Sequence, residues 1–302
     1  MRSFAYKVKG ELCRTGLQRH CCCRAEAYGV LLYCNTFNAQ EIRIITENPE
    51  FAARLPRLFK KAFDLHFDSV PESDIGSGKL IFRIEDPEKL DRIISQLGYD
   101  ARQSAVVHVN FGLLEEECCR SALLRGAFLS GGSVTDPEKR YHLELATSHA
   151  QASREMSALL TEMGFSPRSV RRGGSSVIYF KQCEYIEDFL TTIGAPAAAV
   201  EIMTTKLAKE VRNDVNRVTN CDMANVNKTV AAAQAQCAAI EKLRSAGMLE
   251  TQPPKLRETA LLRLENPELS LEDISRKCDP PVTKSCINHR MRKLMEAARD
   301  LK

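Results

Sequence analysis

Cysteines are the first residues of this chain whose type and spacing suggest chemistry, because thiolates bind soft metals and form disulfides. The 302 residues include 12 cysteines, with adjacent runs at Cys21-Cys22-Cys23 and Cys118-Cys119. His20 could add a zinc ligand, but no two cysteines are separated by two residues, the usual unit of a zinc site. Adjacent cysteines suit a disulfide framework poorly, and a long chain without an export signal is expected to stay reduced. We therefore predict buried structural thiols on helices, with no metal and no cofactor.

A second group of chemically capable residues lies near the C-terminus. It consists of hydrogen-bonding and cationic side chains, Thr283, Lys284, Ser285, Asn288, His289, Arg290, Arg292 and Lys293. Arg and Asn can make bidentate contacts to guanine and adenine, while Lys and Ser can contact bases or phosphates. These types predict double-stranded DNA as the partner. A solvated helix face, or a small bundle that binds protein, is the alternative.

The distribution of charge supports the same interpretation. The chain carries a formal net charge of +4. Basic and acidic residues balance over residues 1–199 and again over residues 200–282, so the whole excess lies in the last twenty residues. A local basic stripe of this kind is typical of a contact with nucleic acid.

The elements that would position these C-terminal residues are three short helices, over residues 255–266, 270–277 and 283–301. Ser270 can cap the second helix, with Asp273 three residues later, and Thr283 can cap the third. Ile287, Met291, Leu294 and Ala298 recur at helical spacing and predict one buried stripe. This is the layout of a helix-turn-helix, in which the N-terminal part of a basic helix meets base edges.

The segment before these helices, residues 204–247, is rich in alanine and predicts a helix. Five asparagines interrupt it, at Asn213, Asn216, Asn220, Asn225 and Asn227. Because Asn is a poor residue for a helix interior, we expect a break near residues 220–225. We favour capping and interdomain contacts for these amides over hydrogen bonds to phosphate. Residues 251–254 read as a linker.

The first two thirds of the chain contain an internal duplication. Cys22-Cys23-Arg24 precedes Gly29, and Cys118-Cys119-Arg120 precedes Gly126. Matched segments follow in order: strands at 41–50 and 142–151, helices at 51–65 and 153–165, strands at 78–85 and 174–181, and helices at 87–98 and 183–194. Each half is predicted to fold as α-β-β-α-β-β-α, with two helices crossing closely at the glycines. We expect one joined antiparallel sheet with pseudo-two-fold symmetry.

Six basic residues on or beside the strands are candidates for secondary DNA contacts: Arg43, Lys79, Arg83, Arg171, Arg172 and Lys181. A plain exposed sheet face is the alternative.

The predicted domains are residues 1–114 and 115–200 for the two repeats, 201–254 for a helical connector and linker, and 255–302 for the DNA-binding domain. No apolar run is long enough to span a membrane and the start lacks a signal-peptide pattern, so we expect a cytoplasmic protein that does not contact membranes.

The duplication, with helix ends at residues 25–35 and 123–132, resembles the LAGLIDADG homing endonucleases. The resemblance implies that one acidic residue from each repeat would hold divalent metal at the scissile phosphates. Alignment on the two glycines places Cys34 and Gly131 at these acid positions, and neither is a ligand for a hard cation. The nearest acids, Glu26 and Asp136, lie before the motif or past the turn. We therefore predict that the protein is not an enzyme, with an active metal-dependent nuclease as the remote alternative.

The duplicated domain and the C-terminal helix-turn-helix together resemble the WhiA family. The resemblance covers the chain, through SFAYKVKGELCR at 3–14, CCRSALLRGAFLSGGSVTDP at 118–137, NRVTNCDMANVNKTVAAA at 216–233, and SLEDISRK with KSCINHRMRKL near the end. It implies an α+β protein, a pseudo-two-fold LAGLIDADG-like domain followed by an all-α helix-turn-helix domain. It also implies a nucleoid-associated transcriptional regulator involved in cell division and chromosome segregation, or in sporulation in some lineages. A protein-interaction module that docks a division or transcription partner through its N-terminal domain is the alternative function.

Overall fold

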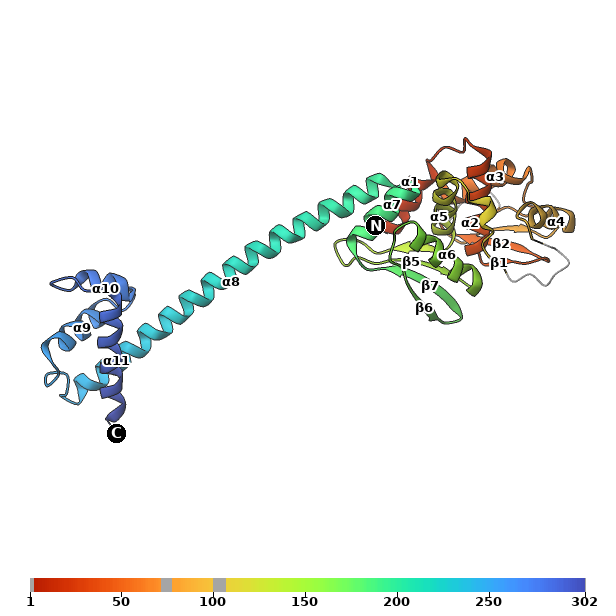
Figure 1. Cartoon of the computed structure of the whole chain (residues 1–302). Coiled ribbons are helices and arrows are strands. Elements are labelled where there is room, and N and C mark those ends of the chain that lie inside the picture. The colour runs from red at the N-terminus through yellow and green to blue at the C-terminus, as the bar shows by residue number, and fades with distance from the viewer. Residues whose placement is uncertain (1–2, 72–77, 100–106, 302) are drawn as a thin grey trace. The chain divides into compact units, whose positions relative to one another are not determined.

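The structure of the chain, a computed structural model, describes residues 3–71, 78–99 and 107–301 (Figure 1). It divides into two units, residues 1–209 and 210–302, and each has its own hydrophobic core. The first unit contains both repeats, and the second contains the C-terminal helices.

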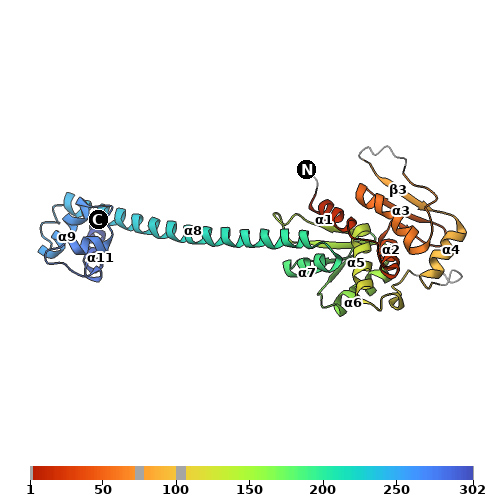
Figure 2. The same cartoon turned by 90° about the horizontal axis from the view of Figure 1, so that it is seen from above.

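Two helices from the two repeats, α2 (His20–Tyr33) and α5 (Glu117–Gly131), pack side by side in the first unit (Figures 1 and 2). A Cβ atom added at Gly29 would lie 2.0 Å from the carbonyl oxygen of Leu123. A Cβ atom added at Gly126 would lie 1.9 Å from the carbonyl oxygen of Glu26. No side chain larger than hydrogen fits at either position, so the predicted close crossing at the two glycines is confirmed.

The second repeat follows the predicted order of elements. After α5 come β4 (Gly132–Val134), β5 (Leu143–Thr147), α6 (Ala150–Glu162), β6 (Arg168–Arg172), β7 (Ser175–Phe180) and α7 (Cys183–Ile193). The four strands are antiparallel and lie in the order β4-β5-β7-β6. The core side of the sheet carries Leu143, Leu145 and Ile178, which are fully buried.

The first repeat is a reduced version of the same plan, preceded by α1 (Phe4–Cys13). Its elements after α2 are β1 (Thr36–Phe37), β2 (Ile42–Thr46), α3 (Pro49–Phe63), β3 (Leu80–Ile84) and α4 (Pro87–Gln96). Among the described residues its sheet has three strands in the order β1-β2-β3, and an isolated bridge from Ser69 to Arg83 stands beside β3 where the second repeat has β6. A 3-10 helix, η1 (Phe111–Leu113), leads to the second repeat.

The prediction of one joined sheet was wrong, since the described strands form two separate sheets. The strands that follow directly from the central helices, β1 and β4, are edge strands of two and three residues. The repeats are joined instead by the α2–α5 contact, reinforced by the hydroxyl of Thr147, which donates to the carbonyl oxygen of Leu32 over 2.6 Å. The helix packing that the sequence predicted therefore joins the repeats, without a shared sheet among the described strands.

The predicted break near residues 220–225 was also wrong, because α8 (Pro196–Ser245) is one continuous helix. The five asparagines lie within it and are exposed, so they do not cap a helix. Asn costs a helix less than about 1 kcal/mol relative to Ala, which is too little to stop a helix rich in good helix formers. No described helix has both the length and the apolarity to cross a membrane.

The second unit contains the end of α8 and three further helices, α9 (Pro254–Glu265), α10 (Leu271–Lys277) and α11 (Lys284–Asp300). The predicted caps are confirmed, since Ser270 accepts a hydrogen bond from the Asp273 amide and Thr283 accepts one from the Cys286 amide. The core of this unit combines Ile240 and Leu243 of α8 with side chains of all three later helices.

Candidate nucleic-acid interface

Helix α11 has one buried face and one exposed basic face. Ile287, Met291, Leu294 and Ala298 are at most 4% exposed, which confirms the predicted buried stripe. The predicted DNA-binding side chains at the helix start and along its other face are exposed: Thr283, Lys284, Ser285, Asn288, His289, Arg292 and Lys293. The cationic and amide side chains in this set lie within three helical turns: Lys284, Asn288, Arg292 and Lys293. Three turns are long enough for these side chains to reach a few base pairs in a groove.

The orientation of α11 is held by bonds to the rest of the second unit. The ammonium of Lys242 donates to the carbonyl oxygen of Ala298 over 3.0 Å, near the C-terminal end of α11 where a cation is favourable. The Val282 amide donates to the carbonyl oxygen of Ser275 over 3.0 Å and closes the turn after α10. Both ends of the exposed basic face are therefore held by the fold.

Arg290 differs from the other predicted contact residues. Its side chain is half-buried, and its Nη1 donates to the hydroxyl of Thr259 in α9 over 3.1 Å. Arg292 lies on the exposed face, with Nη2 3.1 Å from Nδ1 of His289. Arg292 also lies 4.0 Å from the carboxylate of Glu296 on the same face. The structure thus separates a cation that joins α11 to α9 from cations on the exposed face.

Sequence reasoning missed the buried polar residues that support this unit. Arg263 is only 2% exposed, and its Nη1 donates over 2.7 Å to the carbonyl oxygen of Leu269 in the turn between α9 and α10. Burial lowers the pKa of the Arg263 guanidinium. The pattern of α9 offered no signal for this role, because Arg257 and Arg263 are indistinguishable until the helix is packed.

The basic residues of the first sheet form a balanced cluster. Arg43 of β2 and Arg83 of β3 are direct cross-strand partners, which places two like charges together. Glu41 lies 3.9 Å from each guanidinium and offsets their repulsion. Arg43 also donates to the hydroxyl of Thr36 over 3.1 Å. These contacts leave less free positive charge on this face than the sequence suggested.

The second sheet brings Arg172 and Lys181 together with Arg140, a cation that was not among the predicted contacts. Both line a hollow of about 430 Å³ on the sheet surface with Arg140 and His142, but Glu144 lies in the same hollow, 3.6 Å from Arg172. Successive residues of a strand point to opposite faces, so Arg171 is directed away from Arg172. The six predicted secondary contacts therefore do not form one patch.

A second hollow, of about 510 Å³, lies at the C-terminal ends of α2 and α5, beside Cys34 and Gly131, the positions at which the family resemblance placed the metal-binding acids. Lys9, Asn35, Lys79 and Ser130 line it. Cys34 beside it is buried, and its thiol donates to the carbonyl oxygen of Thr36 over 3.1 Å, while burial raises the pKa of that thiol to about 12. Glu47 lines the same hollow, which therefore presents one carboxylate together with two lysines and the amides of Asn35 and Asn48, and not a pair of carboxylates.

The two nearest acids have other partners. Glu26 is buried between the repeats, where Arg54 binds it through two bonds of 2.6 and 2.9 Å and Arg125 binds it over 2.9 Å. Asp136 accepts a hydrogen bond from the Glu138 amide in an exposed turn. A carboxylate neutralised by two guanidiniums and held away from solvent is a structural ion-pair group.

The thiol prediction is only partly confirmed. Cys23, Cys34, Cys119, Cys183 and Cys278 are buried, but Cys21 and Cys221 are exposed. The burial expected for Cys21 was wrong, because this residue lies at the open end of α2. The rejection of metal considered ligands within a single stretch of chain, and the structure shows a group of four thiols drawn from two helices.

Two family models match the chain. One is described as the WhiA LAGLIDADG-like domain and covers residues 120–212. The other is described as the WhiA C-terminal HTH domain and covers residues 215–298. The second match spans the end of α8 together with α9, α10 and α11.

Full-length relatives carry the same name. A probable cell division protein WhiA of Ruminiclostridium cellulolyticum is 37% identical over 98% of this chain and 97% of its own length. Another, from Alkaliphilus oremlandii, is 36% identical over 99% of this chain and 98% of its own length. Among solved structures, a full-length WhiA of Thermatoga maritima aligns with a TM-score of 0.61 at 24% identity, covering 100% of this chain and 99% of that one. At this identity the structural likeness describes the fold.

Proposed function

The chain belongs to the WhiA family, and on this premise we propose that it is a non-enzymatic, sequence-specific DNA-binding regulator of transcription that acts in cell division. The names of the relatives support the division role. The proposal extends, on the family resemblance alone, to chromosome segregation, to sporulation in lineages that form spores, and to a cytoplasmic location on the nucleoid.

The observation that carries the proposal is the two-faced α11. Its apolar stripe is buried in the core of the second unit, while Lys284, Asn288, Arg292 and Lys293 stand exposed beside a capped helix start. A helix start favours phosphate, and Asn and Arg side chains one turn apart match the edges of adenine and guanine. The expected contact is insertion of the N-terminal half of α11 into the major groove.

Alanine substitution of Asn288 and Arg292 tests this assignment. If both make bidentate base contacts, each change is expected to cost about 1–3 kcal/mol in binding to the recognised site. Affinity for unrelated DNA is expected to change little, so specificity relaxes. The measurement is genome-wide mapping of bound sites, followed by footprinting on those sites with purified full-length variants.

Two matched controls lie on the same helix. Arg299→Ala removes an exposed cation near the far end of α11 and is expected to leave specificity intact. Arg290→Ala removes the bond to Thr259 and is expected to lower thermal stability more than it changes base preference. Unchanged footprints in the Asn288→Ala/Arg292→Ala variant would defeat the assignment of α11 as the reading element.

The absence of catalysis is checked on the same bound DNA. With Cys34 and Gly131 at the positions of the metal-binding acids, we expect no cleavage when the complex is incubated with Mg²⁺. A specific double-strand cut that requires Mg²⁺ would show that the protein is a nuclease and would contradict the proposal.

A further inference from the structure

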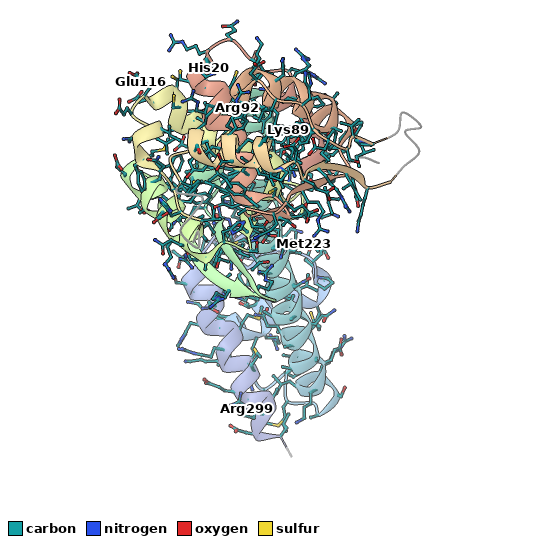
Figure 3. The ribbon with its side chains drawn as sticks, turned by 90° about the vertical axis from the view of Figure 1, so that its right-hand side faces the viewer. His20, Lys89, Arg92, Glu116, Met223 and Arg299 are labelled. Carbon is teal, nitrogen blue, oxygen red and sulfur yellow. The ribbon has the colours of Figure 1, made fainter. Side chains whose placement is uncertain are left out.

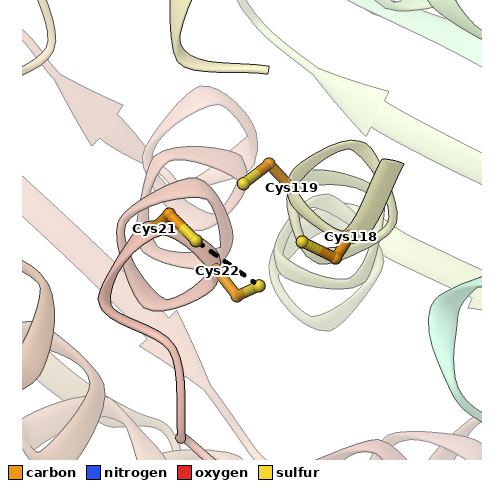
Figure 4. Close-up of side chains that lie close together, drawn as sticks. All are labelled: Cys21, Cys22, Cys118 and Cys119. Carbon is orange, nitrogen blue, oxygen red and sulfur yellow. Dashed lines mark hydrogen bonds between the residues drawn. The ribbon is translucent and has the colours of Figure 1, made fainter. Parts of the chain in front are cut away.

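Four cysteines from the two repeats meet at the N-terminal ends of α2 and α5. The sulfur atoms of Cys21, Cys22, Cys118 and Cys119 all lie within 4.8 Å of one another. Figure 4 shows the four thiols directed into the space between the two helices. In Figure 3, His20 and Glu116, at the starts of these helices, lie on the same side of the first unit.

The grouping follows from the symmetry of the helix pair. Cys21 precedes Gly29 by the same number of residues as Cys118 precedes Gly126, and Cys22 and Cys119 correspond in the same way. Because α2 and α5 cross at these glycines, equivalent positions on the two helices come together at the same distance from the crossing point. The paired cysteines are therefore matched by the fold, although almost a hundred residues separate them in the chain.

We propose that Cys21, Cys22, Cys118 and Cys119 bind one zinc ion that joins the two repeats. Four thiolates around one centre form the ligand set that soft thiophilic ions such as Zn²⁺ prefer. Tetrahedral zinc with bonds of about 2.3 Å would bring its sulfur ligands to about 3.8 Å from one another. The Cys21 and Cys22 sulfurs are 4.0 Å apart and all four sulfurs lie within 4.8 Å of one another, so inward shifts of at most about 1 Å complete the geometry.

The surroundings favour a cation bound by thiolates. The guanidinium of Arg19 lies 3.7 Å from the sulfur of Cys118. The starts of two helices add partial positive charge that stabilises thiolates.

The position indicates a structural role. All four coordination positions are supplied by protein, which is typical of closed, structural zinc sites. The cluster lies at the helix ends opposite Cys34 and Gly131, and so at a distance from the hollow that replaces the endonuclease metal site. A bound ion would cross-link α2 to α5 on the side of the glycine crossing that the sheets do not cover.

Metal binding by the full-length protein tests the proposal. The protein is purified under reducing, metal-free conditions and titrated with Co²⁺, whose tetrahedral thiolate complexes show intense sulfur-to-metal charge-transfer and d–d absorption bands. We expect these bands to saturate at one ion per chain and to disappear when Zn²⁺ displaces Co²⁺. Zinc bound only to the folded state is also expected to raise the melting temperature.

Cys21→Ser is the main variant, because this thiol is exposed and its replacement leaves the core intact. Mutation of a residue that only hydrogen-bonds to a metal ligand typically weakens metal binding about 10–100-fold. Loss of a ligand itself is expected to weaken zinc binding by about a hundredfold or more. Cys221→Ser is the matched control, an equally exposed thiol on α8 whose loss should leave one ion per chain. Circular dichroism verifies that both variants fold.

Three results would overturn the assignment. Binding of far less than one ion per chain by the reduced wild-type protein would show that the thiols do not form a metal site. Equal binding by Cys21→Ser and wild type would place the ion elsewhere. If protein purified without oxygen contains iron and sulfide and no zinc, the four thiols bind an iron–sulfur cluster and not a single zinc ion.

Discussion

Lys9 shows how burial alters the proton affinity of a single side chain. Its ammonium lies 6.0 Å from the centre of the Phe128 ring and lines the hollow at the C-terminal ends of α2 and α5. Burial lowers the pKa of this lysine from 10.5 to about 8. The folded protein therefore binds this proton less tightly than the unfolded chain does.

A pH-dependent stability follows from that shift. Between about pH 8 and 10.5 the unfolded chain holds more protons at this residue than the folded chain, so the free energy of unfolding should rise with pH across this range. Lys9→Met should lack this rise and should be more stable than wild type near neutral pH. Urea unfolding of both proteins at several pH values measures the difference. Lys79→Met, at an exposed position of the same hollow, controls for loss of a charge.

Parallel pH profiles for wild type and Lys9→Met would show that Lys9 keeps its ordinary proton affinity. The comparison of two proteins cancels other groups that titrate in the same range, since those groups are common to both.

At the scale of elements, the crossing of α2 and α5 is the contact that assembles the first unit. Two glycines at equivalent positions bring the helix backbones together, and Glu26 and Arg125 then form an ion pair between the repeats. The N-terminal ends of the same helices carry the four thiols, and their C-terminal ends lead into the two sheets. One helix pair therefore sets the positions of the proposed zinc site, the hollow and both sheets.

Gly29→Ala tests the importance of the crossing. The new methyl group would lie 2.0 Å from a backbone oxygen of the facing helix, which cannot move aside as a flexible side chain can. Overpacking of this kind commonly costs about 1–3 kcal/mol, and a backbone clash is expected at or above the upper end. Gly16→Ala is the control, because its nearest atom is a side-chain carbon at 3.5 Å. Similar unfolding free energies for the two variants would contradict the crossing.

At the scale of the whole molecule, the chain combines a first unit whose charges nearly balance with a second unit that carries the basic α11. The core of the second unit extends back into α8, because Ile240 and Leu243 are fully buried within it and Leu249 is 3% exposed. The three helices after residue 254 therefore lack part of their own core.

Two fragments test this dependence. A fragment of residues 232–302 retains the buried end of α8 and is expected to unfold cooperatively on heating. A fragment of residues 255–302 exposes the surfaces that Ile240, Leu243 and Leu249 cover, and is expected to show reduced helicity and no sharp transition. Circular dichroism melting curves measure both. A cooperative transition at the same temperature in the shorter fragment would show that the end of α8 is dispensable.

Features that depend on neighbouring residues could be predicted from the sequence. The caps at Ser270 and Thr283, the buried stripe of α11 and the alternation within the strands are local patterns, each contained within one short stretch of chain. The duplication was visible because both copies keep their order and spacing. Its glycines predicted a close crossing, since a glycine repeated at one place in two apolar helices has few other physical explanations.

Other features depend on distances between residues far apart in the chain, and only the tertiary structure decided them. Helix propensity could not show that α8 continues past five asparagines, because each costs too little to end a long helix. Strand patterns do not reveal which edges meet, so the two separate sheets were missed. Arg290 and Arg292 differ in role because only one packs against α9. Two cysteine pairs become one group of four thiols because the helices that carry them cross at equivalent glycines, and no local spacing contains that information.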